Sequence, residues 1–141
     1  MNSLDNFYRL FTENGLVTDM NRVRMLWVFT YIWTIIPLLI CFLYYLIPPI
    51  SKHFRSRIGW IIFLIISAII VLITAYSTFL GLEAQNILKV KNDPNSGFRF
   101  GQGHSTFINF SFILLFLSTL LFFIYSLLIK RVSKYKFTTP F

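Results

Sequence analysis

The stretch MLWVFTYIWTIIPLLICFLYYL, residues 25–46, decides the fold because it runs for 22 residues without a charged side chain. Two later stretches, residues 58–80 and 107–129, each run for 23 residues without charge. A helix of about 20 apolar residues crosses the ~30 Å hydrocarbon core of a bilayer. Strands of a β-barrel would instead alternate polar and apolar residues. The sequence therefore predicts an all-α, polytopic membrane protein with three transmembrane helices.

The composition of the whole chain agrees with this prediction. Of the 141 residues, 56% are hydrophobic and 13% are charged, whereas a soluble domain has about 25% charged residues. The first apolar run is longer than the apolar region of a signal peptide, and we expect it to be retained. We predict a single membrane domain, residues 1–141, made of an N-terminal segment (1–24), three spans (25–46, 58–80 and 107–129), an outer loop (81–106) and a basic tail (130–141).

The charges indicate an orientation in the membrane. The chain has 13 Lys and Arg against 5 Asp and Glu, a net charge of +8, which membrane topology explains better than a nucleic-acid partner. The short first loop and the tail carry no acid and these cations: Lys52, Arg55, Arg57, Lys130, Arg131, Lys134 and Lys136. The positive-inside rule then predicts the N-terminus outside and the C-terminus inside, although Arg22 and Arg24 argue the other way. We expect a cell inner membrane, with the mitochondrial inner membrane as the alternative.

Ionisable side chains are missing from the spans, which contain no Asp, Glu, Lys, Arg or His. Proton relays, ion-coupled transport and voltage sensing depend on such groups. The single cysteine, Cys41, excludes an intramolecular disulfide and a cysteine-based metal site within one chain. We therefore predict a protein that is not an enzyme and has no catalytic, cofactor-binding or metal-binding residues.

Small and hydroxyl-bearing residues recur at helical spacing in each span, which predicts helix packing faces. The predicted packing residues are Thr30, Thr34, Pro37, Cys41, Ser67, Thr74, Gly81, Asn109, Ser111, Ser118, Thr119 and Ser126. Lining of a pore is the alternative role, which would require more polarity. Tryptophans and tyrosines toward the span ends, among them Trp60, Tyr44 and Tyr45, are typical of aromatic belts.

The segments outside the spans carry the candidate contacts for partners or lipid. The seven cations above can bind anionic phospholipid on the cytoplasmic side. Arg99 and His104, beside two glycines, could form a small anion niche or simply anchor the loop. Residues 3–13 favour a short interfacial helix, because Leu4, Phe7, Tyr8 and Phe11 share one face and Asn14-Gly15 supplies a stop. A tail packed on a partner is the alternative.

Three functions fit these observations. The first is a non-catalytic subunit, structural or anchoring, of a larger membrane assembly such as a respiratory complex or a secretion, gliding or injection machine. The second is a homo-oligomeric channel, because the predicted topology resembles that of class I holins, although no residue motif carries that likeness. The third is a module that binds a lipid or a quinone. The expected partners are other membrane proteins or copies of the chain, together with phospholipids.

Overall fold

Helices account for nearly all of the chain that the computed structural model describes, which is residues 3–12, 14–46, 57–84 and 104–132. In chain order they are α1 (Ser3–Arg9), α2 (Asn14–Arg22), α3 (Met25–Leu46), α4 (Arg57–Ala84) and α5 (His104–Val132). No strand occurs among these described residues. The predicted all-α fold with three long apolar helices is confirmed.

The three long helices are long and apolar enough to span a membrane over Met25–Tyr45, Arg57–Leu82 and Ser105–Arg131. α3 has the bounds that the sequence predicts, whereas α4 and α5 extend beyond their apolar runs at both ends. The 28 residues of α4 make a helix of about 42 Å. This length matches a bilayer with its headgroup layers, ~40–45 Å, rather than the hydrocarbon core alone. The helices are therefore longer than the hydrocarbon core is thick.

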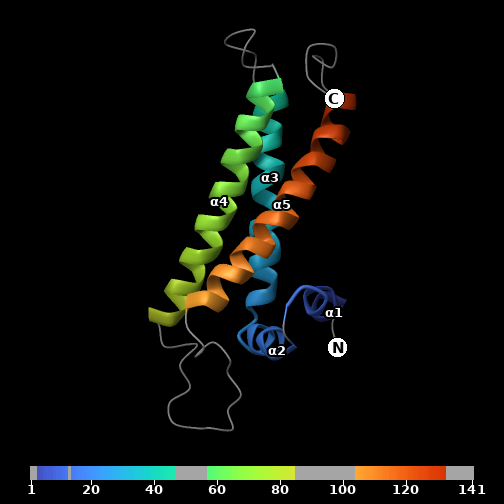
Figure 1. The fold of residues 1–141 in the computed structure, drawn as a ribbon. Helices are drawn as coiled ribbons and strands as arrows, with labels where there is room; N and C mark the ends of the chain where they lie inside the picture. Colours follow the sequence, from blue (N-terminus) through green and yellow to red (C-terminus); the bar gives the residue numbers. More distant parts are fainter. Residues whose placement is uncertain (1–2, 13, 47–56, 85–103, 133–141) are drawn as a thin grey trace, which may run out of the picture.

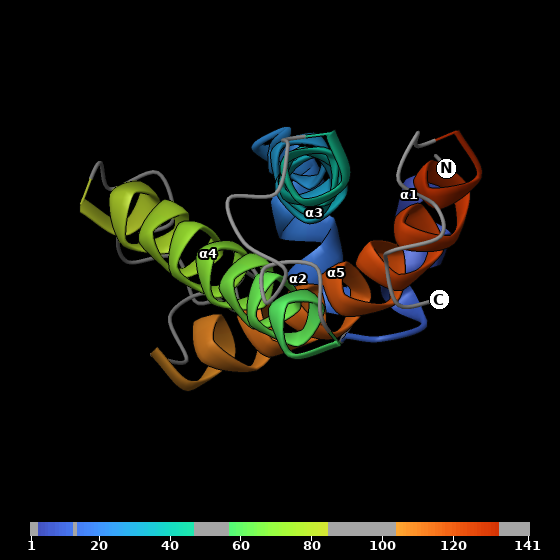
Figure 2. The ribbon, with the colours of Figure 1, turned by 90° about the horizontal axis from the view of Figure 1, so that it is seen from above.

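The three helices run up, down and up between two ends of the bundle (Figure 1). We call the end that carries α1 and α2 the foot, and the opposite end the head. Seen from above, α3 lies nearly along the line of sight, while α4 and α5 are tilted and cross each other (Figure 2). α5 packs against both α3 and α4. The tilt opens the bundle away from the crossing and leaves room for other elements at the foot.

The main core lies toward the foot and draws residues from all five helices. Its buried side chains, here called the foot cluster, are Tyr8, Leu16, Val17, Met20, Leu26, Phe29, Ile32, Val71, Ala75, Phe79, Leu82, Phe107, Phe110, Leu114 and Leu117. Within it, Phe79 stacks on Phe29 with ring centroids 4.6 Å apart and on Phe107 at 4.8 Å. Phe110 meets the edge of Phe29 at 5.2 Å. Such offset and edge-to-face ring pairs add stability beyond their buried area.

The N-terminal segment forms two helices rather than the single predicted one. α1 ends at Arg9, and the Thr12 N–H donates to the Tyr8 carbonyl at 3.0 Å in the turn that follows. The prediction that Asn14-Gly15 ends a helix is wrong, because Asn14 begins α2. The physical reason is burial. α2 places Leu16, Val17 and Met20 in the foot cluster.

The chain turns sharply between α2 and α3. Arg24 has φ of 55°, in the left-handed region, and its N–H donates to the Asn21 carbonyl at 3.0 Å. A left-handed residue after a helix end is usually glycine, and a side chain in this conformation costs about 1–2 kcal/mol. The turn lets α2 lie across the foot before α3 rises (Figure 1).

A second and smaller core, the head cluster, lies at the opposite end. It consists of Ile40, Cys41, Tyr44, Tyr45, Trp60 and Phe122. The prediction that Tyr44, Tyr45 and Trp60 face lipid as an aromatic belt is wrong, since the two tyrosines are fully buried and Trp60 is 8% exposed. Trp27, at 53% exposed, does face outward. The buried rings close the space between α3, α4 and α5 as the helices splay.

Candidate functional site

The most developed polar feature of the molecule lies at the foot, where Tyr8 of α1 enters the bundle. Its side chain is fully buried, and its hydroxyl lies 2.9 Å from both Trp33 Nε1 and Thr30 Oγ1. Thr30 donates its own proton to the Leu26 carbonyl at 2.8 Å. Tyr8 must therefore accept from Trp33 and donate to Thr30. We call this ordered chain of donors, from Trp33 through Tyr8 and Thr30 to the Leu26 carbonyl, the foot relay.

The foot relay fixes α1 against α3 because each donor has an acceptor. Hydrogen bonds in a chain polarise one another, and in a water-poor setting each is costly to break. Aromatic contacts surround the relay: Phe7 stacks on Trp33 at 5.9 Å, and Tyr8 meets Phe110 of α5 at 5.8 Å. Burial raises the pKa of the Tyr8 hydroxyl above its ordinary value of 10.0, and the bonds to Thr30 and Trp33 lower it only in part. Tyr8 is thus neutral at physiological pH.

The hairpin of α1 and α2 has a polar link of its own. Asn21 Nδ2 donates to Asp5 Oδ2 at 3.0 Å, and Asp5 is 5% exposed. The other carboxylate oxygen, Asp5 Oδ1, and Arg9 Nε are buried without a hydrogen-bond partner among the described residues. Buried polar atoms without partners are uncommon in folded proteins. The hairpin therefore carries less complete polar pairing than the foot relay that docks it.

A second polar contact joins the three long helices at the head. Trp60 Nε1 of α4 donates to Ser126 Oγ of α5 at 2.7 Å, and Cys41 Sγ of α3 lies 3.7 Å from the same oxygen. Ser126 is 1% exposed and Cys41 is fully buried. We call these three side chains the head junction. Ser126 thus contacts both the buried thiol of α3 and the indole of α4, and it links the three long helices.

The structure places the predicted packing residues in two groups. Pro37, Cys41, Ser67, Ser111, Ser118 and Ser126 are buried between helices, whereas Thr30, Thr34, Thr74 and Thr119 are half-buried. Gly81 and Asn109 are exposed, and a methyl group added at Gly81 would meet nothing within 4 Å. These two residues do not pack helices within this chain. α3 continues through Pro37 as one helix.

Most hydroxyls of the predicted packing faces bond to their own helix. The Oγ atoms of Thr34, Thr74, Ser111, Ser118 and Thr119 donate to carbonyls three or four residues earlier at 2.6–2.9 Å. Only Thr30 and Ser126 bond to another helix among these described residues. Ser67 Oγ, by contrast, is buried without a hydrogen-bond partner in the described part of the chain. The helices therefore associate on these faces through close packing of side chains more than through hydrogen bonds between helices.

The predicted cationic contacts lie largely beyond the described residues. Lys52, Arg55, Arg99, Lys134 and Lys136 fall outside them, and His104 is the first residue of α5. Arg57 begins α4 at the head, where Lys130 and Arg131 form the last turn of α5. Arg57 and Arg131 are exposed and Lys130 is half-buried. Cations in a last helical turn interact favourably with the helix dipole.

Two of the residues that matter most, Tyr8 and Trp60, are not among the predicted site residues. Tyr8 does fall on the apolar face predicted for residues 3–13, but its hydroxyl partners lie 22 and 25 positions away in the chain. No group of three or more His, Cys, Asp or Glu side chains that could hold a metal ion occurs in the described ranges. Comparisons of the chain with protein families, with curated proteins and with solved structures find no match.

Proposed function

We propose that the chain is a non-catalytic integral membrane subunit, structural or anchoring, of a larger membrane assembly. The observation that carries the proposal is the character of the outward faces of α4 and α5. All exposed positions from residue 58 to 73 are isoleucine, and all exposed positions from 112 to 128 are Phe, Leu or Ile. These faces suit lipid or the apolar spans of neighbouring proteins.

The same faces argue against the alternative of a holin-like homo-oligomeric pore. A water-filled pore needs polar groups along its length. Apart from cations at the head, the exposed polar side chains that the structure describes on α4 and α5 lie only toward the foot, at Ser77, Ser105 and Asn109. The threonine hydroxyls of α4 donate to their own helix. Thr and Ser commonly satisfy themselves in this way within spans.

A further surface suits a partner at the foot. Leu10, at 77% exposed, and Phe11, at 42% exposed, follow α1 and lie outside the long helices. Exposed apolar residues on a docked hairpin can insert into the headgroup layer or into a neighbouring subunit. The hairpin would then act as a clamp that the foot relay holds in a fixed position.

The subunit proposal is tested by purifying the chain through a C-terminal tag in a gentle detergent, followed by mass spectrometry of the bound proteins and native mass measurement. A discrete set of other membrane proteins at fixed ratio supports it and identifies the process. A single species at a multiple of 16.6 kDa contradicts it and favours the pore, which a liposome leakage assay would then test. A variant with Leu10→Ser and Phe11→Ser, which leaves the spans intact, tests whether the hairpin contributes to capture.

We propose further that the chain lies in the cell inner membrane with the foot on the outer side and the head on the cytoplasmic side. The short first loop and the tail, which carry the seven cations, support this orientation. Single cysteines placed at Ser96 and at Ser133, in a Cys41→Ala background, test it with a reagent that does not cross membranes. Labelling of Ser96→Cys in intact cells and of Ser133→Cys only after the membrane is opened is the expected result; the reverse pattern would refute the orientation.

A further inference from the structure

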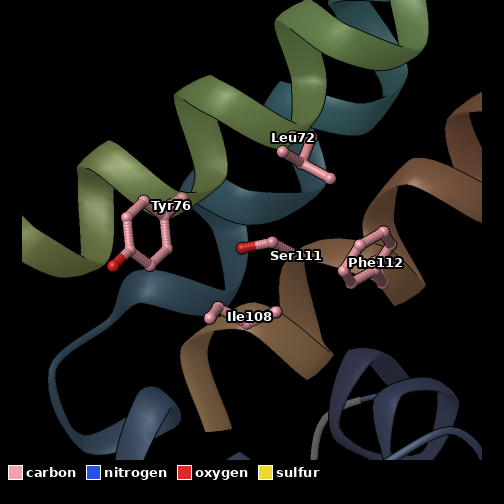
Figure 3. Close-up of a pocket in the computed structure, with 5 residues that line it drawn as sticks. All are labelled: Leu72, Tyr76, Ile108, Ser111 and Phe112. Atoms are coloured by element: carbon pink, nitrogen blue, oxygen red, sulfur yellow. The ribbon is translucent and has the colours of Figure 1, made fainter. Parts of the chain in front are cut away.

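A cavity of about 390 Å³ lies between α4 and α5 in the half of the bundle nearer the foot. Leu72 and Tyr76 of α4 and Ile108, Ser111 and Phe112 of α5 line it (Figure 3). Its volume falls within the ~300–1,000 Å³ that ligand pockets occupy in proteins. The lining is apolar except for the hydroxyls of Tyr76 and Ser111.

The cavity is reached from the bilayer rather than from water. All five lining residues lie within the candidate spans Arg57–Leu82 and Ser105–Arg131. Ile108 and Phe112, which are 42% and 55% exposed, form its rim on the outer surface. A buried water needs about three hydrogen bonds, and Ser111 already donates its proton to the Phe107 carbonyl at 2.8 Å. An apolar occupant drawn from the membrane therefore fits the walls better than water.

One wall carries a donor that has no acceptor among the described residues. The Tyr76 hydroxyl makes no hydrogen bond to any described residue, and its side chain stands at the edge of the cavity in Figure 3. Within hydrocarbon, an O–H without an acceptor is unfavourable. Tyr76 lies six residues from the Leu82 end of its span, a rise of about 9 Å along the helix. α4 is also tilted relative to α3 (Figure 2), and the separation measured along α3 is therefore less than this rise.

We propose that the cavity binds one acyl chain of a membrane phospholipid, whose ester carbonyl accepts a hydrogen bond from Tyr76. A phospholipid joins a long apolar chain to a carbonyl oxygen at the boundary of the hydrocarbon layer. The apolar walls receive the acyl chain, and the phenol supplies the one lining donor that makes no hydrogen bond to a described residue. This site requires insertion into a bilayer but does not depend on membership of an assembly.

The test is native mass spectrometry of the full chain after reconstitution in vesicles of phosphatidylethanolamine and phosphatidylglycerol and extraction in mild detergent. We expect one retained phospholipid per chain. Tyr76→Phe removes only the hydroxyl and should lower the retained fraction about threefold, the value of one average hydrogen bond within a membrane. Leu72→Phe places an aromatic ring in the cavity wall and narrows the cavity without filling it. Because it displaces part of the acyl chain from its apolar contacts, it should lower retention by more than Tyr76→Phe does.

Two matched variants control for changes elsewhere. Tyr31→Phe makes the same chemical change at a tyrosine that is 55% exposed on α3, and Ile69→Phe adds a ring at an outward position of α4 that does not line the cavity. Both should retain lipid as the unchanged chain does. Equal retention by Tyr76→Phe and Tyr31→Phe, or no retained lipid in the unchanged chain, would overturn the proposal. A dimer that Leu72→Phe dissociates would also overturn it, because a second copy would then fill the cavity.

Discussion

The foot and the head of the bundle each contain buried hydrogen bonds between helices, but different parts of the chain supply them. At the head, an indole, a serine and a thiol from the three long helices meet directly. At the foot, the corresponding hydrogen bonds involve Tyr8, which α1 delivers from outside the spans. The head is therefore complete once the spans assemble, whereas the foot depends on a separate element. Substitutions at the two ends should consequently have different signatures.

The largest effect is expected from Tyr8→Ala. The substitution removes a fully buried ring and leaves the Trp33 N–H without its acceptor. Loss of a large buried aromatic side chain costs about 3–5 kcal/mol, which should release α1 and α2 while the long helices stay packed. Limited trypsin digestion should then cut rapidly at Arg9, which is half-buried in the intact hairpin. Unchanged digestion would show that α2 alone holds the hairpin.

Serine-to-alanine substitutions at three buried positions should change the stability of the chain in different directions. Ser126→Ala leaves the buried Trp60 N–H without an acceptor and should destabilise the head by about 1–3 kcal/mol. Ser67→Ala removes a buried hydroxyl that has no partner in the described chain and should stabilise it by about 1 kcal/mol. Ser118→Ala, whose hydroxyl bonds its own helix, is the near-neutral control. Thermal unfolding in detergent measures all three, and equal shifts would contradict this ranking.

Alkaline pH should weaken the docking of α1 at the foot. The pKa of Tyr8 is raised above 10.0 by burial, so the docked state favours the neutral phenol. The contribution of Tyr8 to docking is complete below pH 10.0 and is lost as the pH rises toward the higher pKa of the docked state. The anisotropy of a dye attached at Asn6→Cys, an exposed position on α1, reports docking.

Tyr8→Phe is the matched control for this pH dependence. Phenylalanine has no hydroxyl to ionise. In this variant α1 should dock more weakly, because the foot relay is lost, but the substituted side chain should add no dependence on alkaline pH. If the Tyr8→Phe variant lost docking at the same pH as the unchanged chain, another group would be responsible.

The smallest effect is expected at Gly81, near the end of α4. A methyl group there would meet nothing within 4 Å, and glycine within a helix is less favourable than alanine by about 0.5–1 kcal/mol. Gly81→Ala should therefore stabilise the chain by no more than that amount in the same thermal assay. A loss of stability would indicate that Gly81 packs closely against a neighbour in the membrane.

The sequence alone predicts the three long helices because each apolar run exceeds the thickness of the hydrocarbon core. It does not predict α2, since residues 14–22 are short and mostly polar and Asn-Gly is also a common helix end. The burial of Leu16, Val17 and Met20 becomes visible only when the bundle that receives them is present. Local sequence patterns therefore predict the three spans but do not predict α2, which docks on them.

The candidate site was harder to predict for a related reason. Helical spacing places Ser111, Ser118 and Ser126 on inward faces, but spacing does not say whether a hydroxyl bonds its own backbone or a neighbouring helix. That choice depends on which donor the adjacent helix brings: Trp60 reaches Ser126, whereas Ser118 keeps its bond to Leu115. Similarly, the pairing of Tyr8 with Trp33 spans 25 positions, and no local pattern records it.

The contact between Tyr8 and Phe110 also has a consequence for biogenesis. It joins α1 to α5, and the ribosome delivers α5 only after α1, α2, α3 and α4 have emerged. The N-terminal hairpin can therefore reach its final position only when the third span has been inserted beside the first two. Until then, the rings that receive Phe110, those of Tyr8 and Phe29, present an open aromatic surface, by which a membrane chaperone or protease can tell an unfinished chain from a finished one.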